Sequence, residues 1–480
     1  MWSSLASFDR ALVVAMGMCL GLSGAISHAA GEPRSAVATR VDFSYAFATP
    51  HRITIGRPDS SDRTLLDLQP GSLRMAWSYD DLTHYPLATF KTPPTAWSIG
   101  ITPQFDGRSF ARSRWTRCEG FLPALENTYE DVPGTVRLEA IGGITAALVR
   151  IEITNRDTKP HQFLLRCDSA NMCENPAWVD PTQSPGDNLV AGWNDRADRV
   201  LVLGVGADAY SLQADGMAAA QKTLLMVWNV KPGEKRSGWL VRPYRGYAAD
   251  LPTLRVKDWG QELTEAKREW HALLTRAAKV VIPDPGVATA FLACLADLFI
   301  MREPVAGGYL GGVPGTEVYR AASSGEAGIM AVALDQLGLH KEAVEGYRMG
   351  IEMQEPDGNW NDHKGWGHLM WCMAGFKARA ILEHYRLTGD RKYLAEVYPR
   401  LLASSRWQER QRQRTRVSAG ADRPLTYGLL PRGFGDCGLM NDGDMYGVFL
   451  PHNIWAVYAA SVAVEAAEIL GHAKDLDELR

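Results

Sequence analysis

The first half of the sequence, from about residue 37 to residue 252, alternates between apolar and polar positions with a period of two. This alternation is typical of strands that bury one face. A strand, a turn and a second strand follow one another in two places: residues 145–154, 155–157 and 161–167, and residues 224–230, 231–234 and 237–243. Short strands at this spacing, without a helical period between them, predict an antiparallel β-sandwich.

The period changes near Asp258, where apolar residues begin to recur at helical spacing. Leu263, Ala266 and Trp270 share one face of a helix predicted over residues 259–278. The pattern then stays helical, and the further predicted helices span residues 287–301, 325–337, 341–353, 369–387, 391–414 and 452–470. Glycines follow three of these helices, at positions 338, 389 and 471, and glycine readily adopts the left-handed conformation that ends a helix. The helices are therefore expected to form antiparallel pairs.

The connections between these helices alternate in length. The joints at the three glycines are short, whereas residues 303–324, 354–368 and 415–451 form long segments rich in Gly, Trp and acids. Functional residues concentrate on loops that a rigid scaffold holds in place. We therefore expect the functional site on the rim of the helical array that carries the long loops.

The N-terminal residues resemble a cleaved secretory signal. Arg10 precedes an apolar stretch over residues 11–26, and Ser27-His28-Ala29 ends it with a small-x-small pattern. An uncleaved anchor is the alternative, but the run is shorter than the roughly 20 apolar residues that a span requires. We expect a secreted or periplasmic protein with no membrane segment in its mature form. The predicted organisation is a signal peptide at 1–29, a β-sandwich domain at 37–256, a linker helix at 257–282 and an all-α domain at 283–480.

Composition narrows the partners. The 51 Lys and Arg residues nearly balance the 55 Asp and Glu residues, so the basic patch of a nucleic-acid-binding protein is not expected. Trp is abundant, with 15 residues in 480, which points to a ligand that binds flat aromatic rings. No Cys-x-x-Cys motif occurs, and His363 and His368 lack supporting ligands, so we predict no structural zinc and no cofactor.

Several segments resemble the six-hairpin glycosidases, a superfamily of (α/α)6-toroid enzymes that includes glucoamylases, trehalases, bacterial α-glucosidases and related phosphorylases. Many of these enzymes have an N-terminal β-sandwich and a linker helix. The segments that carry the resemblance are Ile282-Pro283-Asp284, MAVALDQLG, YRLTGDRKYLAEVYPRLLASSRW, GLLPRGFGD and HNIWAVYAA. The resemblance implies a partial (α/α)6 toroid after the sandwich and a carbohydrate substrate.

Glycosidic bonds are normally cleaved by two carboxyl groups, one that protonates the leaving oxygen and one that activates water. The loop GFGDCGLMNDGDMYG offers Asp436, Asp442 and Asp444. In the resembled superfamily the general acid lies in the loop that enters the sixth helix, which implies Asp444 as the first candidate and Asp436 as the second. The alternative is an Asp-rich turn or a Ca²⁺ loop, although the spacing does not match the EF-hand pattern.

Aromatic and polar residues of the long loops are the candidate sugar contacts. Trp combines a large contact area with a polar group, which suits a sugar ring, although these rings could equally cap helix ends. Superfamily members often place an Arg-Asp pair before the second helix, where this sequence has Arg-Ala, and a plain first-turn glutamate is the favoured interpretation of Glu326. The candidate substrate-binding residues are Arg320, Glu326, Trp360, Asp362, Trp366, Tyr446 and Asn453.

The leading hypothesis is a glycoside hydrolase that acts on small glycosides or oligosaccharide ends, with inversion at the sugar carbon. A glycoside phosphorylase and a non-catalytic carbohydrate-binding or scaffold protein, or an inactive fragment, are the alternatives. A six-hairpin toroid needs more helices than the roughly 200 residues after Pro283 supply, and the resemblance implies a general base further along the chain than Arg480. A homo-oligomer, which would cover the apolar faces of the end helices, stays open.

Overall fold

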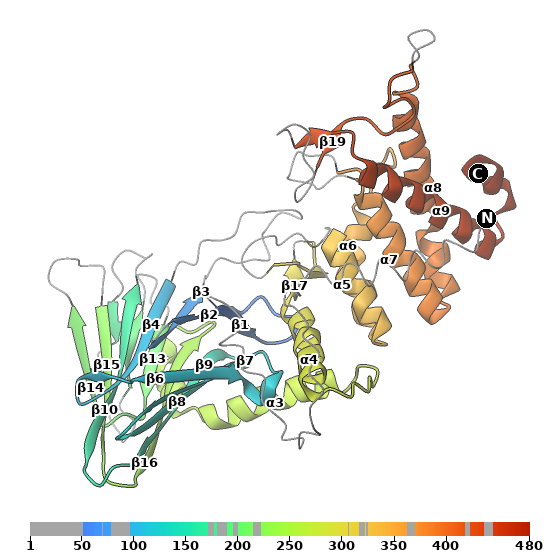
Figure 1. The fold of residues 1–480 in the computed structure, drawn as a ribbon. Helices are drawn as coiled ribbons and strands as arrows, with labels where there is room; N and C mark the ends of the chain where they lie inside the picture. The colour runs from blue at the N-terminus through green and yellow to red at the C-terminus, as the bar shows by residue number, and fades with distance from the viewer. Residues whose placement is uncertain are drawn as a thin grey trace, which may run out of the picture. The chain divides into compact units, whose positions relative to one another are not determined.

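The computed structural model describes residues 51–69, 71–77, 97–170, 177–179, 190–194, 200–214, 222–305, 307–315, 322, 325–361, 370–417, 423–435 and 445–480. All of them belong to one compact unit, Arg40–Arg480. Figure 1 shows strands over the first half of this unit and helices over the second. The predicted division into a β-rich N-terminal region and a helical C-terminal region is confirmed.

Two antiparallel sheets make up the described β-rich region. The first sheet has the order β1-β2-β3-β4-β10-β15-β14, with β5 paired to β4. Its strands are β1 (His51–Gly56), β2 (Arg63–Gln69), β3 (Ser72–Trp77), β4 (Trp97–Phe105), β5 (Arg108–Ser109), β10 (His161–Ala170), β14 (Ala209–Ala214) and β15 (Lys222–Val230). The second sheet has the order β11-β12-β13-β16-β9-β8-β7-β6. Its strands are β6 (Arg112–Arg117), β7 (Ala124–Asp131), β8 (Gly134–Gly142), β9 (Ala146–Asn155), β11 (Ala177–Val179), β12 (Val190–Asn194), β13 (Val200–Val205) and β16 (Lys235–Pro243).

The core between the sheets follows from the period of two. Val149, Ile151 and Ile153 of β9 alternate with more exposed positions and join the same buried cluster as Phe163 and Leu165 of β10. Because successive side chains point to opposite faces of a sheet, each strand contributes every second residue to this core. The buried cluster contains residues of both sheets, so the predicted β-sandwich is the observed arrangement.

The two strand-turn-strand units contain the expected strands, but each unit connects two different sheets. β9 and β16 pair with each other in the second sheet, whereas β10 and β15 pair in the first. Each turn therefore forms an arch from one layer to the other. Local alternation cannot reveal this, because a strand with one buried face has the same pattern in either sheet.

Asn155 joins the two arches. This fully buried residue donates its side-chain Nδ2 to the carbonyl oxygens of Lys159, at 2.8 Å, and of Val230, at 2.9 Å. Its backbone N–H donates to the carbonyl of Glu234 at 3.1 Å, and its carbonyl accepts from the N–H of Gly233 at 3.1 Å. One residue thus forms hydrogen bonds with backbone groups of both turns, although the two turns are far apart in the sequence.

The predicted linker helix is α3 (Trp259–Leu274), which follows the short α2 (Leu251–Val256). Asp258 caps α3 by accepting from the N–H of Gln261 at 2.9 Å. Leu263, Ala266 and Trp270 are buried on one face, as the helical spacing predicts, and join a cluster that includes Leu148 on the outer face of β9. The helix therefore covers part of the second sheet.

The helices beyond α3 begin and end close to the predicted positions, and two small hairpins that were not predicted lie between them. They are α4 (Pro285–Ile300), β17 (Arg302–Val305), β18 (Tyr309–Gly312), α5 (Gly325–Gln336), α6 (His340–Glu352), α7 (Met373–Thr388), α8 (Arg391–Gln413), β19 (Gly433–Phe434), β20 (Tyr446–Gly447), α9 (Leu450–Leu470) and α10 (Ala473–Leu479). Gly338, Gly389 and Gly471 have φ values of 74°, 69° and 83°, so the predicted left-handed ends are confirmed.

Helices α5, α7 and α9 form an inner row in which α7 packs against both of the others, while α6 packs on α5 and α8 packs on α9. Near the start of α7, Gly375 lies against Trp455 near the start of α9. Near the ends of the same two helices, Arg386 pairs with Glu465. The end of α7 also meets the end of α5, where His384 contacts Asp335. The three inner helices therefore run in the same direction, with their N-terminal ends at one rim and the short turns at the other.

Among the described helices, α9 is long and apolar enough to cross a membrane by length and composition. The same helix packs against α7, α8 and α10 and buries Val462, Ala463, Ala466 and Ala467 in the helical core. Core helices of soluble proteins can have the same length and apolar composition, so these two properties of α9 are weak support for a membrane span.

The sandwich and the helices are joined by ion pairs, and one of them contains the fully buried Arg302. Arg302, at the start of β17, is 0% exposed and lies over the ring of Phe299 at 5.4 Å. Its Nε is 3.0 Å from a carboxylate oxygen of Asp59, in the connection between β1 and β2. Burial raises the pKa of Asp59 to about 6, against the opposing effect of Arg302. Burial of the guanidinium group also lowers the pKa of Arg302, whereas the Asp59 side chain keeps 31% of its surface exposed.

Replacing Asn155 with Ala should lower the free energy of unfolding by about 1–3 kcal/mol, because two buried carbonyl groups lose their donor. Urea denaturation measures this change. Asn229→Ala, an exposed amide in the adjoining strand, is the matched control and should stay within about 0.5 kcal/mol of the wild type. Equal effects of the two substitutions would contradict the role of Asn155 in joining the arches.

The raised pKa of Asp59 predicts a pH-dependent stability. Between the ordinary carboxyl pKa of about 4 and the folded value of about 6, the folded state binds more protons than the unfolded state. The contribution of Asp59 to the free energy of unfolding should therefore fall as the pH rises through this window. Urea unfolding of the wild type and Asp59→Asn at several pH values measures the free energy of unfolding of each. The wild-type value minus the Asp59→Asn value should decrease from pH ~4 to pH ~6. A difference that is constant or increases would refute the prediction.

Candidate functional site

The candidate site lies at the rim where α5, α7 and α9 begin. The N-terminal end of a helix carries a partial positive charge, and each of these ends follows one of the long loops. The three helix ends at this rim therefore carry partial charge of the same sign. This arrangement favours negatively charged groups at the rim.

Asn361 anchors the loop that precedes α7. It is fully buried, and its carbonyl accepts from the N–H of Met370 at 3.2 Å. Its side-chain Oδ1 accepts from the N–H of Ala374, in the first turn of α7, at 3.0 Å. The residues on either side of segment 362–369 are thereby held together and fastened to the start of α7.

A second anchor holds the loop that precedes α9. Strands β19 and β20 pair antiparallel, with Phe434 opposite Tyr446, and the N–H of Gly435 donates to the carbonyl of Met445 at 2.6 Å. The rings of Phe434 and Tyr446 meet edge to face at 5.6 Å. A backbone hydrogen bond thus joins Gly435 to Met445, which are the chain neighbours of Asp436 and Asp444.

Aromatic side chains connect the two anchors. Phe376 of α7 and Trp455 of α9 pack with ring centroids 4.3 Å apart. Both are partly buried and, with Phe434, surround a small cluster of Met370, Cys372 and Met373. Residues from both loops and from two inner helices therefore form one apolar group, which we call the rim cluster.

The predicted acids lie outside the described residues, and so do three of the predicted sugar contacts. These residues are Asp436, Asp444, Arg320, Asp362 and Trp366. Their assignments stay predictions.

Two predicted contacts are exposed at the rim. Tyr446 is 36% exposed and its carbonyl accepts from Arg432 at 2.9 Å. Glu326 is exposed in the first turn of α5, where the favoured interpretation placed it as a helix-starting glutamate. Both positions are compatible with a ligand at the rim.

Trp360 has the environment of a packing residue. It is 2% exposed, and its indole N–H donates to the carbonyl of Ile351 at 3.1 Å. Its own carbonyl accepts from the buried ammonium group of Lys377 at 2.6 Å. The ring therefore has no open face for a sugar, and its contacts match the alternative interpretation, in which it caps a helix end.

Asn453 uses both ends of its amide within the protein. Its Oδ1 accepts from the N–H of Leu430 at 2.8 Å, and its Nδ2 donates to the carbonyl of Phe449 at 3.0 Å. The side chain thus links the loop before β19 to the first turn of α9. This is a positioning role at the rim.

Sequence reasoning did not single out Phe376, Phe434 or Trp455 as site residues. Trp455 lies in the segment HNIWAVYAA, and its aromatic type at the start of a predicted helix was the available signal. Its contact with Phe376 crosses from α9 to α7 and depends on the packing of the inner row. Among the described residues, the cluster of potential metal ligands lies away from this rim, at the short-turn side of the helices.

A bacterial glucoamylase, whose structure was solved as a complex with acarbose, has a similar arrangement of strands and helices. The match covers 90% of this chain and 67% of the glucoamylase chain, with a TM-score of 0.52 and 12% sequence identity. This chain shares the glucoamylase fold. The expected resemblance to the six-hairpin glycosidases is thereby confirmed at the level of the fold.

Two further solved structures match less closely. A putative kojibiose phosphorylase from the human microbiome matches with a TM-score of 0.38 and 10% identity over 88% of this chain and 70% of its own. An inverting mannosidase of family GH92 from Bacteroides thetaiotaomicron matches with a TM-score of 0.36 and 8% identity over 74% of this chain and 62% of its own. No protein-family model and no curated protein sequence matches the chain.

The rim cluster depends on the close approach of α7 and α9 at Gly375. A Cβ atom at this position would lie 2.7 Å from the carbonyl oxygen and ring of Trp455. Gly375→Ala should therefore lower the free energy of unfolding by about 1–2 kcal/mol, because overpacking exceeds the helix-propensity gain of Ala. Thermal or urea denaturation measures the change. Gly346→Ala in α6, where the nearest atom would be 3.9 Å away, should be neutral or stabilising, and similar losses in both variants would contradict the packing argument.

Proposed function

We propose that the protein is a glycoside hydrolase that acts on small glycosides or oligosaccharide ends. The observation that carries the proposal is the glucoamylase fold of the chain, together with the aspartates and aromatic residues of the long segments that precede the inner helices in the sequence. Fold alone does not define chemistry, so the assignment rests on the loops as well. Their residue types are those that glycosidic cleavage requires.

In this proposal Asp444 is the general acid and Asp436 is the second candidate for that role. The acid protonates the glycosidic oxygen as the bond breaks, and a carboxylate base activates the attacking water. We propose inversion, which requires the two carboxyl groups to stand about 6.5–9.5 Å apart so that water fits between them. No residue of this sequence is assigned to the base.

The described part of the rim supports a sugar ligand in two ways. Phe434 and Tyr446 flank the aspartate segment in the sequence, and Phe434 and Trp455 both pack in the rim cluster. Aromatic faces bind the apolar side of a sugar ring, while polar groups bind its hydroxyls. The parallel helix N-termini also favour a negatively charged catalytic group.

Secretion or periplasmic location belongs to the same proposal. Its support is the apolar N-terminal stretch with the small-x-small ending at Ala29. Cell fractionation and N-terminal sequencing of the mature protein test it, and an intact Met1 in the cytosolic fraction would refute it.

The proposed activity predicts release of sugar from a panel of aryl glycosides and oligosaccharides without added phosphate. Asp444→Asn should lower kcat/KM by about 10²–10⁴-fold, because loss of acid catalysis removes this much of the rate. Asp390→Asn is the matched control. Asp390 caps α8 at the other rim through the N–H of Tyr393, and Asn caps a helix equally well, so activity should be unchanged.

The outcomes separate the alternatives. Turnover that requires phosphate would indicate a phosphorylase, and sugar binding without turnover would indicate a binding protein. If Asp444→Asn and Asp436→Asn both retain wild-type activity, the assignment of the acid is wrong. The configuration of the first-formed sugar, followed by NMR, tests inversion, and light scattering tests self-association.

A further inference from the structure

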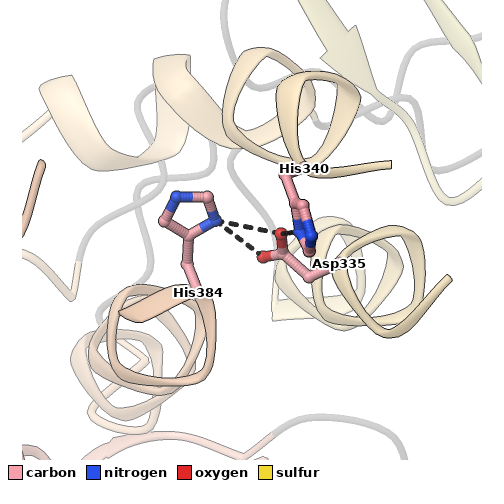
Figure 2. A group of neighbouring side chains, drawn as sticks. All are labelled: Asp335, His340 and His384. Carbon is pink, nitrogen blue, oxygen red and sulfur yellow. Dashed lines mark hydrogen bonds and ion pairs between the residues drawn. The ribbon is translucent and has the colours of Figure 1, made fainter. Parts of the chain in front are cut away.

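A group of three potential metal ligands lies at the short-turn rim, opposite the candidate site. Asp335 is the penultimate residue of α5, His340 is the first residue of α6, and His384 lies in the last part of α7. Their ligand atoms all lie within 4.8 Å of one another. Figure 2 shows both imidazole rings directing a nitrogen toward the carboxylate of Asp335.

The geometry of the group is convergent. The Nδ1 atoms of His340 and His384 are each 2.9 Å from Oδ1 of Asp335, and the latter nitrogen is also 3.1 Å from Oδ2. Zinc binds nitrogen and oxygen ligands at about 2.0–2.2 Å in a tetrahedron, which separates neighbouring ligand atoms by about 3.4 Å. The two nitrogen-to-carboxylate distances would each lengthen by about half an ångström to admit an ion, while the two imidazole nitrogens already lie within 4.8 Å of each other.

The charge of the group favours a cation. Asp335 is 3% exposed, and within the described part of the chain its ion-pair partners are the two histidines alone. A buried carboxylate is costly unless a positive charge compensates it. The ends of α5 and α7 nearby carry the partial negative charge of helix C-termini, which adds to the attraction, although α6 begins here with the opposite sign.

The group is also accessible. The His384 side chain is 7% exposed, whereas that of His340 is 41% exposed, so an ion can reach the group from the His340 side. Water can complete the coordination on that side. The carboxylate and imidazole ligands match a borderline divalent metal such as Zn²⁺ or Co²⁺ better than Ca²⁺, which prefers oxygen ligands.

We propose that Asp335, His340 and His384 form a binding site for a divalent transition-metal ion. The ion connects the α5–α6 hairpin to α7 at the rim away from the candidate active site, so its role is to stabilise the inner row. The sequence prediction of no structural zinc rested on local motifs. Such motifs cannot reveal this group, because His384 is 49 residues from Asp335 in the chain. Only the packing of α5 on α7 brings these residues together.

Titration of the untagged full-length protein with Zn²⁺ by calorimetry and with Co²⁺ by visible absorption tests the proposal, after chelator treatment and dialysis. The wild type should bind one ion per chain at this site, and its thermal midpoint should rise on saturation. His340→Gln keeps a side-chain donor for Asp335 but removes the imidazole ligand. This variant should lose at least about 100-fold in affinity, more than loss of an outer-shell partner usually costs.

His271→Gln is the matched control, because His271 pairs with Glu119 elsewhere on the surface. It should bind like the wild type. Asp335→Asn, with folding checked by circular dichroism, should also lose binding and the Co²⁺ absorption. Absence of saturable binding by the folded wild type, or unchanged binding by His340→Gln, would overturn the proposal and leave the group as a hydrogen-bonded carboxylate. These measurements do not depend on glycosidase activity, so they stand apart from the proposed function.

Discussion

The close packing of α5, α7 and α9 is the constraint on which the helical region depends. Small residues permit it: Gly375 leaves room for Trp455, and Gly325 leaves room for the ring of Phe376. Glycine inside a helix costs about 0.5–1 kcal/mol relative to Ala, and the contacts formed across the row offset this cost. Because the three helices run in the same direction, every long loop begins at one rim and every short turn lies at the other.

This shared direction gives the two rims different chemistry. The rim of helix N-termini carries the aromatic rim cluster and the anchors of two acid-bearing loops, with partial positive charge beneath them. The opposite rim brings together a buried carboxylate and two imidazoles near helix C-termini. One packing arrangement thus places an anion-favouring site and a cation-favouring site at opposite ends of the same helices.

The junction between the sandwich and the helices combines apolar and ionic contacts. Trp259 and Trp270 of α3 bury apolar area against the second sheet, and Arg117 of that sheet forms a bidentate pair with Asp297 of α4 at 3.0 and 2.6 Å. The pair of buried Arg302 and partly exposed Asp59 adds a contact between the first sheet and β17. Apolar burial provides the stability here, because the desolvation of the buried ions opposes their attraction.

The sequence by itself determined the helices and the strands of the two turn units, because apolar periodicity and Gly at helix ends act over a few residues. Gly389, for example, ends α7 as predicted, and α8 begins at the predicted Arg391. Only the tertiary structure decided that the two turn units are arches between sheets, that Trp360 is a packing residue, and that Trp455 meets Phe376. It also decided the meeting of Asp335 with His384. These features depend on contacts between segments that are distant in the chain. A local pattern of residue types shows that a face will be buried, but several other faces could cover it equally well, and the pattern does not indicate which one does.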